Sequence, residues 1–274
     1  DGTVRGDVYG GYSENGSADD NEVEMNGGTV EYTVYGGYSD YSSAKDTEVK
    51  LTGSTVEGTV YGGYSCYGNA EGNKVTINGG NFSWDVVGGR SYEGNAEGNT
   101  VNITDVASVD YVYGGWSAYK HAISNIVNIN GGNIDGEVYG GYSYCGNNKG
   151  NEVNITGVNN LAYVIGGVIT RGGKSEGNKV TINSGNINGV FSGFGVGGNV
   201  INNEVTINGG TIKDVYGGYV SSGPNISVVE EGNAEGNTVI INGGTIDQVI
   251  AGYSATKVVQ GNEVIISNST VEGY

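Results

Sequence analysis

A six-residue string, VYGGYS, occurs at Val8, Val34, Val60 and Val138, and looser copies of it continue to Val249. The opening valine of one copy follows that of the last by 26 residues in seven successive steps, then by 25 and finally by 34. A fixed period of about 20 to 50 residues indicates a repeat architecture, in which each unit packs only on its neighbours. The chain is therefore restricted to folds that stack copies of one small unit.

Each repeat contains segments in which aliphatic and polar residues alternate, such as NKVTING from Asn73 to Gly79. A period of two is typical of a β-strand with one buried face. The segment TVEGTVYGG, from Thr55 to Gly63, alternates in the same way, and a third strand is expected near Tyr64. We expect the Gly-Gly pairs and the GNAEGN segments to form the turns between the strands.

Two positions of the strand that follows each asparagine are aliphatic in all ten repeats, as stacked copies with a shared core require. They are Val23, Val49, Val75, Val101, Val127, Val153, Val180, Val205, Val239 and Val264, and two residues later Met25, Leu51, Ile77, Ile103, Ile129, Ile155, Ile182, Ile207, Ile241 and Ile266. The pattern predicts an all-β parallel β-solenoid (β-helix) of about ten 26-residue coils, rising about 4.8 Å per coil into a rod of roughly 50 Å. No hexapeptide period is visible, so a right-handed helix or a flatter two-sheeted solenoid is expected.

Glycine and asparagine also occupy fixed columns. The second glycine of VYGG is present in every copy, from Gly11 to Gly252, which indicates either a corner with positive φ or a place with no room for a Cβ atom. An asparagine column runs from Asn21 to Asn262 and is interrupted only by Thr47. Stacked asparagines hydrogen-bond along the stack and satisfy turn backbone, so a structural role is expected for them.

Stacking also aligns the residues that follow each opening valine into a ladder of mostly aromatic rings. A second aromatic column, from Tyr12 to Tyr253, is interrupted by Arg90 and Val168. An exposed apolar stripe of this kind marks an interface. The sequence alone does not decide whether these rings form a buried ladder or an exposed stripe. It favours burial or lateral packing of the rings over stacking on sugars. The candidate interface residues are Tyr9, Tyr35, Tyr61, Tyr113, Tyr139 and Tyr216, together with Ile226, Val228 and Val229.

The last three of these residues lie in the one break of the rhythm, the segment SSGPNISVVEE at residues 221–231, which holds the only proline. Solenoids accommodate insertions at their corners, so we expect an inserted corner loop, which is either a harmless bulge or a contact for a partner. Residues 1–274 are otherwise predicted to form a single repeat solenoid. Because the chain begins and ends within a repeat, we interpret it as an excerpt of a longer array or as a subunit that stacks end to end.

Charge and composition exclude several classes of partner. The formal net charge is −18, with only 12 Lys and Arg, so no basic cluster is available for nucleic acid. No apolar run reaches the length of a membrane span, so no membrane insertion by this segment is expected. Cys66 and Cys145 lie 79 residues apart, about three coils or roughly 14 Å along the axis. A disulfide between them is therefore not expected.

Patterns for catalysis and metal binding are weak, and we predict no enzyme, no catalytic residues and no cofactor. The only histidine, His121, has no triad partner in the sequence, and the carboxylates scatter over turns. The calcium-binding GGxGxD nonapeptide is missing. Calcium bound by Glu71, Glu97 and Glu235 of the GNAEGN segments is a minor alternative to plain polar turns.

The repeat NxVTINGGTIxGxVYGGYSxxGNAEGN resembles the Gly-rich repeats in passenger domains of bacterial autotransporters and related surface adhesins, over essentially the whole chain. The resemblance implies a secreted rod, extracellular or at the bacterial cell surface. We therefore expect a structural and adhesive rod, acting as a stalk, adhesin passenger or filament segment. Its expected partners are neighbouring copies, end to end or side by side, or a host surface receptor or glycan. The alternative is a carbohydrate-binding solenoid that uses its aromatic ladders.

Overall fold

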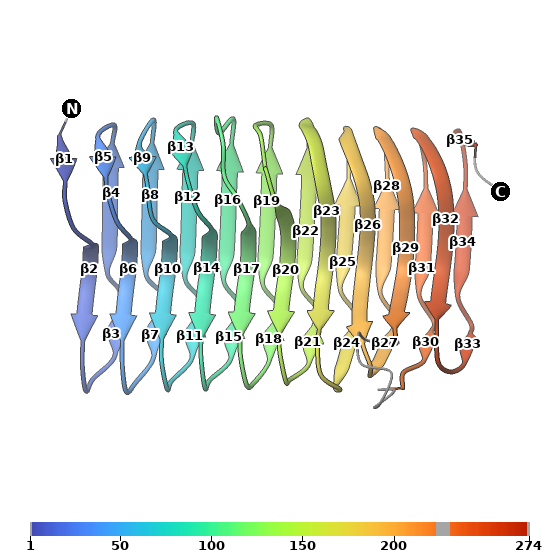
Figure 1. Ribbon diagram of the computed structural model, residues 1–274, viewed down its shortest axis with the longest axis horizontal. Helices are drawn as coiled ribbons and strands as arrows, with labels where there is room; N and C mark the ends of the chain where they lie inside the picture. The colour runs from blue at the N-terminus through green and yellow to red at the C-terminus, as the bar shows by residue number, and fades with distance from the viewer. Residues whose placement is uncertain (1, 223–230, 273–274) are drawn as a thin grey trace.

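Each strand pairs in parallel with the equivalent strand of the next repeat, so the chain advances one coil per repeat (Figure 1). The computed structural model describes residues 2–222 and 231–272. Over these residues the secondary structure consists of strands β1 to β35, with no helix, and hence none that could cross a bilayer. The coils stack into an elongated rod with the two termini at opposite ends. The predicted all-β parallel solenoid of about ten coils is confirmed.

Two long sheets run along the rod. The eleven-stranded sheet, called here the ladder sheet, contains the VYGGYS strings and consists of β2 (Val8–Ser13), β6 (Val34–Ser39), β10 (Val60–Ser65), β14 (Val86–Ser91), β17 (Val112–Ser117), β20 (Glu137–Ser143), β23 (Val158–Ile169), β26 (Gly185–Val196), β29 (Thr211–Ser221), β32 (Thr245–Ser254) and β35 (Thr270–Val271). A ten-stranded sheet contains the strands after the asparagines and consists of β4 (Glu22–Asn26), β8 (Glu48–Thr52), β12 (Lys74–Asn78), β16 (Thr100–Thr104), β19 (Ile126–Asn130), β22 (Glu152–Thr156), β25 (Lys179–Ile182), β28 (Glu204–Ile207), β31 (Thr238–Ile241) and β34 (Glu263–Ile266).

Short strands form two further sheets at the corners. One has ten strands and consists of β3 (Ala18–Asp19), β7 (Ala44–Lys45), β11 (Ala70–Glu71), β15 (Ala96–Glu97), β18 (Ala122–Ile123), β21 (Asn148–Lys149), β24 (Lys174–Glu176), β27 (Asn199–Ile201), β30 (Ala234–Glu235) and β33 (Val259–Gln260). The other has four strands and consists of β1 (Thr3–Val4), β5 (Thr29–Val30), β9 (Thr55–Val56) and β13 (Asn81–Phe82). In the first repeats the expected strand from Thr55 to Gly63 is therefore two strands, β9 and β10, whereas from β23 onward it is continuous.

The strand register agrees with the repeat that the sequence shows. Val60 of β10 pairs with Val34 on one side and with Val86 on the other. The register survives the insertion, because Val215 pairs with Val249. Residues 223–230, which include Ile226, Val228 and Val229, lie outside the described residues.

Aliphatic side chains of the two long sheets fill the interior. In β12, Val75 and Ile77 are buried while Lys74 is exposed, as the alternation predicts. The cluster continues from coil to coil along the rod. At the far end Val264 and Ile266 of β34 are 41% and 50% exposed, because no described coil covers them. The predicted core columns are confirmed.

The Gly-Gly pair of VYGGYS does not form a turn, contrary to the expectation from the sequence. Gly62 and Gly63 lie within β10, and the pairing with β14 leaves Gly62 out of the register. A Cβ atom on Gly62 would lie 2.4 Å from the carbonyl oxygen of Gly88 in the next coil, and one on Gly63 would lie 2.3 Å from the amide of Asn73. Close packing, and not a corner with positive φ, therefore requires glycine at this site.

This irregularity shifts the alternation by one residue. Val60 and Ser65 point inward, while Tyr61 and Tyr64 both lie on the outer face of the sheet. The Ser65 hydroxyl donates to the carbonyl of Ser42 at 2.7 Å and accepts the Gly68 N–H at 2.8 Å, which ties the following corner to the previous coil. Without the shift, only one of the two aromatic positions would face outward.

True turns occur at the other glycines. Gly72 and Gly98 of the GNAEGN segments have φ of 69° and 65°, and Gly79 and Gly80 of an NGG pair have φ of 69° and 99°. These values lie where side chains other than glycine are strained. The expected turn at NGG is confirmed, whereas GNAEGN combines a short corner strand, such as β11 at Ala70–Glu71, with a turn at the glycine that follows it.

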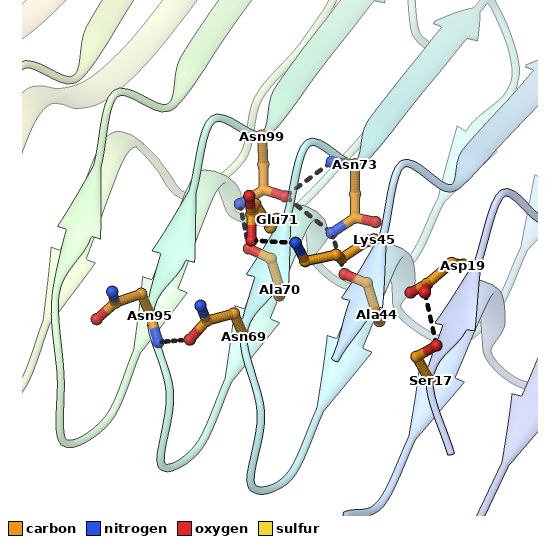
Figure 2. Close-up of polar contacts among 10 residues, drawn as sticks. All are labelled: Ser17, Asp19, Ala44, Lys45, Asn69, Ala70, Glu71, Asn73, Asn95 and Asn99. Atoms are coloured by element: carbon orange, nitrogen blue, oxygen red, sulfur yellow. Dashed lines mark hydrogen bonds and ion pairs between the residues drawn. The ribbon is translucent and has the colours of Figure 1, made fainter. Parts of the chain in front are cut away.

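A ladder of buried asparagines joins the coils at a corner (Figure 2). The Nδ2 of Asn73 donates to Oδ1 of Asn99 at 2.9 Å and to the carbonyl of Ala44 at 3.0 Å. The backbone N–H of Asn73 also donates to Oδ1 of Asn99, at 3.0 Å. Thr47 substitutes for asparagine by donating from Oγ1 to Asn73 at 2.8 Å. The amide-to-amide bond recurs through Asn73, Asn99, Asn125, Asn151, Asn178, Asn203, Asn237 and Asn262.

Candidate functional site

The candidate site is the outer face of the ladder sheet, where two columns of side chains run side by side along the rod. The first column consists of Tyr9, Tyr35, Tyr61, Val87, Tyr113, Tyr139, Ile165, Phe191, Tyr216 and Ile250. The second column consists of Tyr12, Tyr38, Tyr64, Arg90, Trp116, Tyr142, Val168, Phe194, Tyr219 and Tyr253. The in-register parallel pairing places each member directly above the one before.

Rings within a column stack face to face. Tyr9 and Tyr35 have ring centroids 4.8 Å apart and planes 4° apart. Phe191 and Tyr216 lie 4.9 Å apart with planes 1° apart. This separation is close to the spacing between neighbouring strands, so the backbone sets the stacking distance. Each ring face inside a run is covered by the next ring, and only ring edges and hydroxyls reach solvent.

Rings of the two columns meet edge to face. Tyr35 and Tyr38 have centroids 5.3 Å apart and planes 89° apart, and Tyr139 and Tyr142 lie 5.8 Å apart at 85°. This arrangement places the positive edge of one ring against the negative face of the other, which is favourable by about 0.5–1.5 kcal/mol per pair. The perpendicular contacts hold the ring planes in a fixed orientation along the rod.

The six predicted tyrosines are brought together only in groups. Tyr9, Tyr35 and Tyr61 form one stacked run, and Tyr113 stacks on Tyr139 in a second. Tyr216 stacks on Phe191 in a third run. Exposure rises towards the end of the rod, from 7% at Tyr61 to 40% at Tyr9, and the other four are partly buried. The column is therefore mostly half-buried, and it is neither a fully buried ladder nor an open apolar stripe.

Three of the six column tyrosines have a carboxylate two residues before them, namely Asp7, Glu137 and Asp214. The Tyr9 hydroxyl donates to Asp7 at 3.2 Å, and the Tyr139 hydroxyl donates to Glu137. Burial, and then the hydrogen bond to Glu137, raises the pKa of Tyr139 above its ordinary value. Burial likewise raises the pKa of Tyr35 and Tyr113. The hydroxyls thus stay protonated and neutral at neutral pH, and the charge along this edge is negative.

The first interruption of the ladder is filled by the protein itself. Val87 is too short to stack between Tyr61 and Tyr113, but Arg90 of the same coil lies over Trp116, with Cζ 4.3 Å from the ring centroid. Its Nη1 donates to the hydroxyl of Tyr61 at 2.9 Å. A planar cation over aromatic faces is a favourable contact, and here it continues the stack across the gap.

The second interruption has no such filler. Ile165 and Val168 are both aliphatic, and a hollow of about 450 Å³ opens above them. Aromatic rings of the coils on either side form its walls, among them Tyr139, Phe191 and Phe194. Sequence reasoning recorded Arg90 and Val168 only as breaks in a column. The two gaps differ in which residues occupy both columns of the same coil. One coil has Val87 with Arg90, and the other has Ile165 with Val168.

A row of more exposed tyrosines was missed by the sequence analysis. Tyr41 and Tyr67 stack with centroids 5.2 Å apart and planes 2° apart, and they are 61% and 52% exposed. Tyr92 and Tyr119 lie in the following two coils, with ring centroids 5.1 Å apart. Their spacing of 25 to 27 residues follows the repeat and was available in the sequence.

Polar side chains of the first GNAEGN segment make contacts within the protein (Figure 2). Glu71 forms an ion pair with Lys45 at 2.8 Å. The side-chain oxygen of Asn69 accepts the backbone N–H of Asn95 at 2.9 Å. Within the described part of the chain, no three His, Cys, Asp or Glu side chains are grouped as a metal site would require. At Glu71 and Asn69 the polar side chains are thus engaged in contacts within the protein.

Asn69 and Asn95 occupy equivalent positions in successive coils, and His121 occupies that position in the coil after them. Its Nδ1 accepts the backbone N–H of Asn147 at 3.0 Å, as the side-chain oxygen of asparagine does one coil earlier. In the coil before, Oδ1 of Asn95 accepts the backbone N–H of His121 at 3.3 Å, so the histidine replaces an asparagine in a structural ladder. Cys66 and Cys145 are both free, as the spacing of the coils predicts.

Comparison with known proteins gives no match to a family model, to a curated protein or to a solved structure. The functional argument therefore rests on the repeat itself and on the geometry of the two columns.

Proposed function

We propose that this chain is a stiff structural and adhesive rod of a bacterial surface or extracellular protein, where it acts as a stalk, adhesin passenger or filament segment. The observation that supports a stiff rod is the unbroken series of contacts along one axis. Parallel sheets, the asparagine ladder and the stacked rings all join a coil to the next, for example through Asn73 and Asn99 inside and Tyr9 and Tyr35 outside. Bending the rod would have to strain all of these contacts at once.

The exposed edge of β34 supports contacts with neighbouring copies. The outermost strand β34 exposes the core side chains Val264 and Ile266, and its outer edge has no partner strand among the described residues. A strand edge of this kind is a template for pairing with another chain. We propose that this surface is covered when the rod is assembled.

The exposed tyrosines support lateral adhesion. Tyr41 and Tyr67 are 61% and 52% exposed on a rigid backbone, and tyrosine is enriched at protein interfaces for its apolar body and polar tip. Stacking on a sugar needs an open ring face, and most faces in the ladder are covered. The carbohydrate-binding alternative is therefore less favoured, although the hollow at Ile165 offers it one interruption in the stack.

Adhesion can be tested on beads that carry the rod in one orientation. The exposed thiol of Cys145 provides the coupling site, and Cys66→Ser removes the competing thiol. We expect coated beads to adhere to one another or to host-cell layers, and we expect the double variant Tyr41→Ser and Tyr67→Ser to weaken this adhesion. Tyr32→Ser is the matched control, because Tyr32 is 58% exposed but lies outside the aromatic columns.

A glycan array probed with the same coupled protein separates the two functions. Adhesion without glycan binding supports the rod as proposed. Binding to glycans, without adhesion between beads, would favour the carbohydrate-binding solenoid. If neither beads nor cells are retained, the adhesive part of the proposal is wrong.

A further inference from the structure

The two interruptions of the aromatic columns differ in a way that points to a binding site. In both coils the first-column residue is aliphatic, Val87 in one and Ile165 in the other. The second-column residue three positions later is Arg90 in the first case and Val168 in the second. One gap is thus closed by a side chain of its own coil, while the other remains a hollow.

Arg90 shows what this kind of gap accommodates. Its Cζ lies 4.3 Å from the ring centroid of Trp116, 5.5 Å from that of Tyr64 and 5.9 Å from that of Tyr61. One guanidinium nitrogen reaches the Tyr61 hydroxyl, and Nε is buried without a hydrogen-bond partner. Contact with the rings, more than hydrogen bonding, therefore holds the guanidinium, whose flat shape matches one missing layer of the stack.

The hollow at the second gap has the same elements without the cation. Its floor is formed by Ile165 and Val168, which are only 7% and 4% exposed, and its walls are aromatic. Two carboxylate residues, Glu137 and Asp214, line it, and no Lys or Arg is among the described lining residues. A neutral sugar would leave this negative charge uncompensated, whereas a cation would pair with it.

We propose that the hollow binds the guanidinium group of an arginine side chain supplied by a partner polypeptide. The guanidinium takes the place over Val168 that Arg90 takes in its own coil, stacking against the rings and facing Glu137 and Asp214. Arginine fits this site better than lysine, because its charge is spread over a plane that stacks, whereas an ammonium is a compact and strongly hydrated charge. The inference identifies a class of partner and does not depend on the proposed role as a surface rod.

The direct test is a titration of the whole chain followed by methyl NMR, with the signals of Ile165 and Val168 as reporters. The probe is the peptide acetyl-Gly-Arg-Gly-amide, and the matched controls contain lysine or citrulline at the central position. We expect a saturable shift with the arginine peptide in the millimolar range. The lysine and citrulline peptides are expected to bind at least about fivefold more weakly, because one lacks the plane and the other lacks the charge.

Two exchanges between the gaps make the test specific. Val168→Arg supplies the missing guanidinium from the chain itself and is expected to abolish binding of the peptide. Arg90→Val empties the first gap and is expected to create a second site, reported by the Val87 methyl signals, so that the stoichiometry rises from one to two. The pair Glu137→Gln and Asp214→Asn is expected to weaken binding and to reduce its dependence on salt.

Several results would overturn the proposal. The arginine peptide could leave the Ile165 and Val168 signals unchanged, or the lysine peptide could shift them equally. Shifts caused by chitotriose or lactose, but not by the arginine peptide, would assign the hollow to carbohydrate. Binding of the peptide only after removal of residues 223–230 would show that the chain's own segment is the occupant. If Val168→Arg does not fold, Arg90→Val and the unmodified chain still decide the outcome.

Discussion

The buried asparagine ladder makes the sharpest prediction about stability, and Asn125, near the middle of the rod, is the position to perturb. Its side chain donates to Asn151 and to the carbonyl of Ala96, both at 2.9 Å. It accepts from the side chain of Asn99 at 2.9 Å and from the backbone N–H of Asn99 at 3.0 Å. The substitution Asn125→Ala removes all four hydrogen bonds from a site with no exposure to solvent.

The expected loss follows from these contacts. A hydrogen bond contributes about 1 kcal/mol net, and a buried donor left without an acceptor costs about 1–3 kcal/mol more. The backbone N–H of Asn99 becomes such a donor. We therefore expect Asn125→Ala to lower the free energy of unfolding by about 3–6 kcal/mol. At about 1.4 kcal/mol per tenfold change, the middle of this range corresponds to roughly a thousandfold increase in local opening.

Single coils of a solenoid can open without unfolding of the whole chain. Stability therefore has to be measured both for individual coils and for the whole chain. Hydrogen exchange read by mass spectrometry should show faster exchange in the coils around Asn125, and denaturant unfolding should shift to lower concentration. Asn125→Thr should be milder, because Thr47 fills the same column and still donates to the next asparagine.

The matched control is an asparagine ladder on the outer surface. Asn128 donates to Asn102 and accepts from Asn154, both at 2.9 Å, but it is only partly buried. Water can replace these bonds, so Asn128→Ala should cost less than about 1 kcal/mol. Equal losses for Asn125→Ala and Asn128→Ala would refute the reasoning, because burial would then not govern the value of the ladder.

Three further predictions follow from other parts of the rod. Gly115→Ala should destabilise by about 3 kcal/mol in urea unfolding, because its Cβ would lie 2.3 Å from the Asn125 amide, whereas Gly6→Ala, with open space around it, should be neutral. Tyr35 and Tyr139 have raised pKa values in the folded chain, so stability should hold below about pH 10 and fall above it, where the unfolded chain loses its tyrosine protons first. Phenolate absorbance that develops in one step at the ordinary pKa, with the chain still folded, would contradict this. Deleting residues 221–230 should leave the melting temperature nearly unchanged, and unfolding of the rod would show that the segment belongs to the core.

The period and the alternation of side chains were sufficient to predict the solenoid. Residues such as Val75 and Ile77 recur every 26 residues with polar neighbours, and a parallel stack is the arrangement that buries every copy in one core. The same periodicity predicted the asparagine ladder, because identical residues in one register must lie above one another. These features depend on local pattern and register, which the sequence contains directly.

Only the tertiary structure decided what the breaks in the pattern do. Gly62 and Gly63 resemble a turn in the sequence, but they lie within a strand because the next coil and the Asn73 amide leave no room for a Cβ atom. Arg90 and Val168 are equivalent in register, yet one reaches across to rings of neighbouring coils and the other forms the floor of a hollow. These outcomes depend on side-chain size and direction in three consecutive coils at once. Residues distant in sequence determine them, and the repeat of a single coil does not.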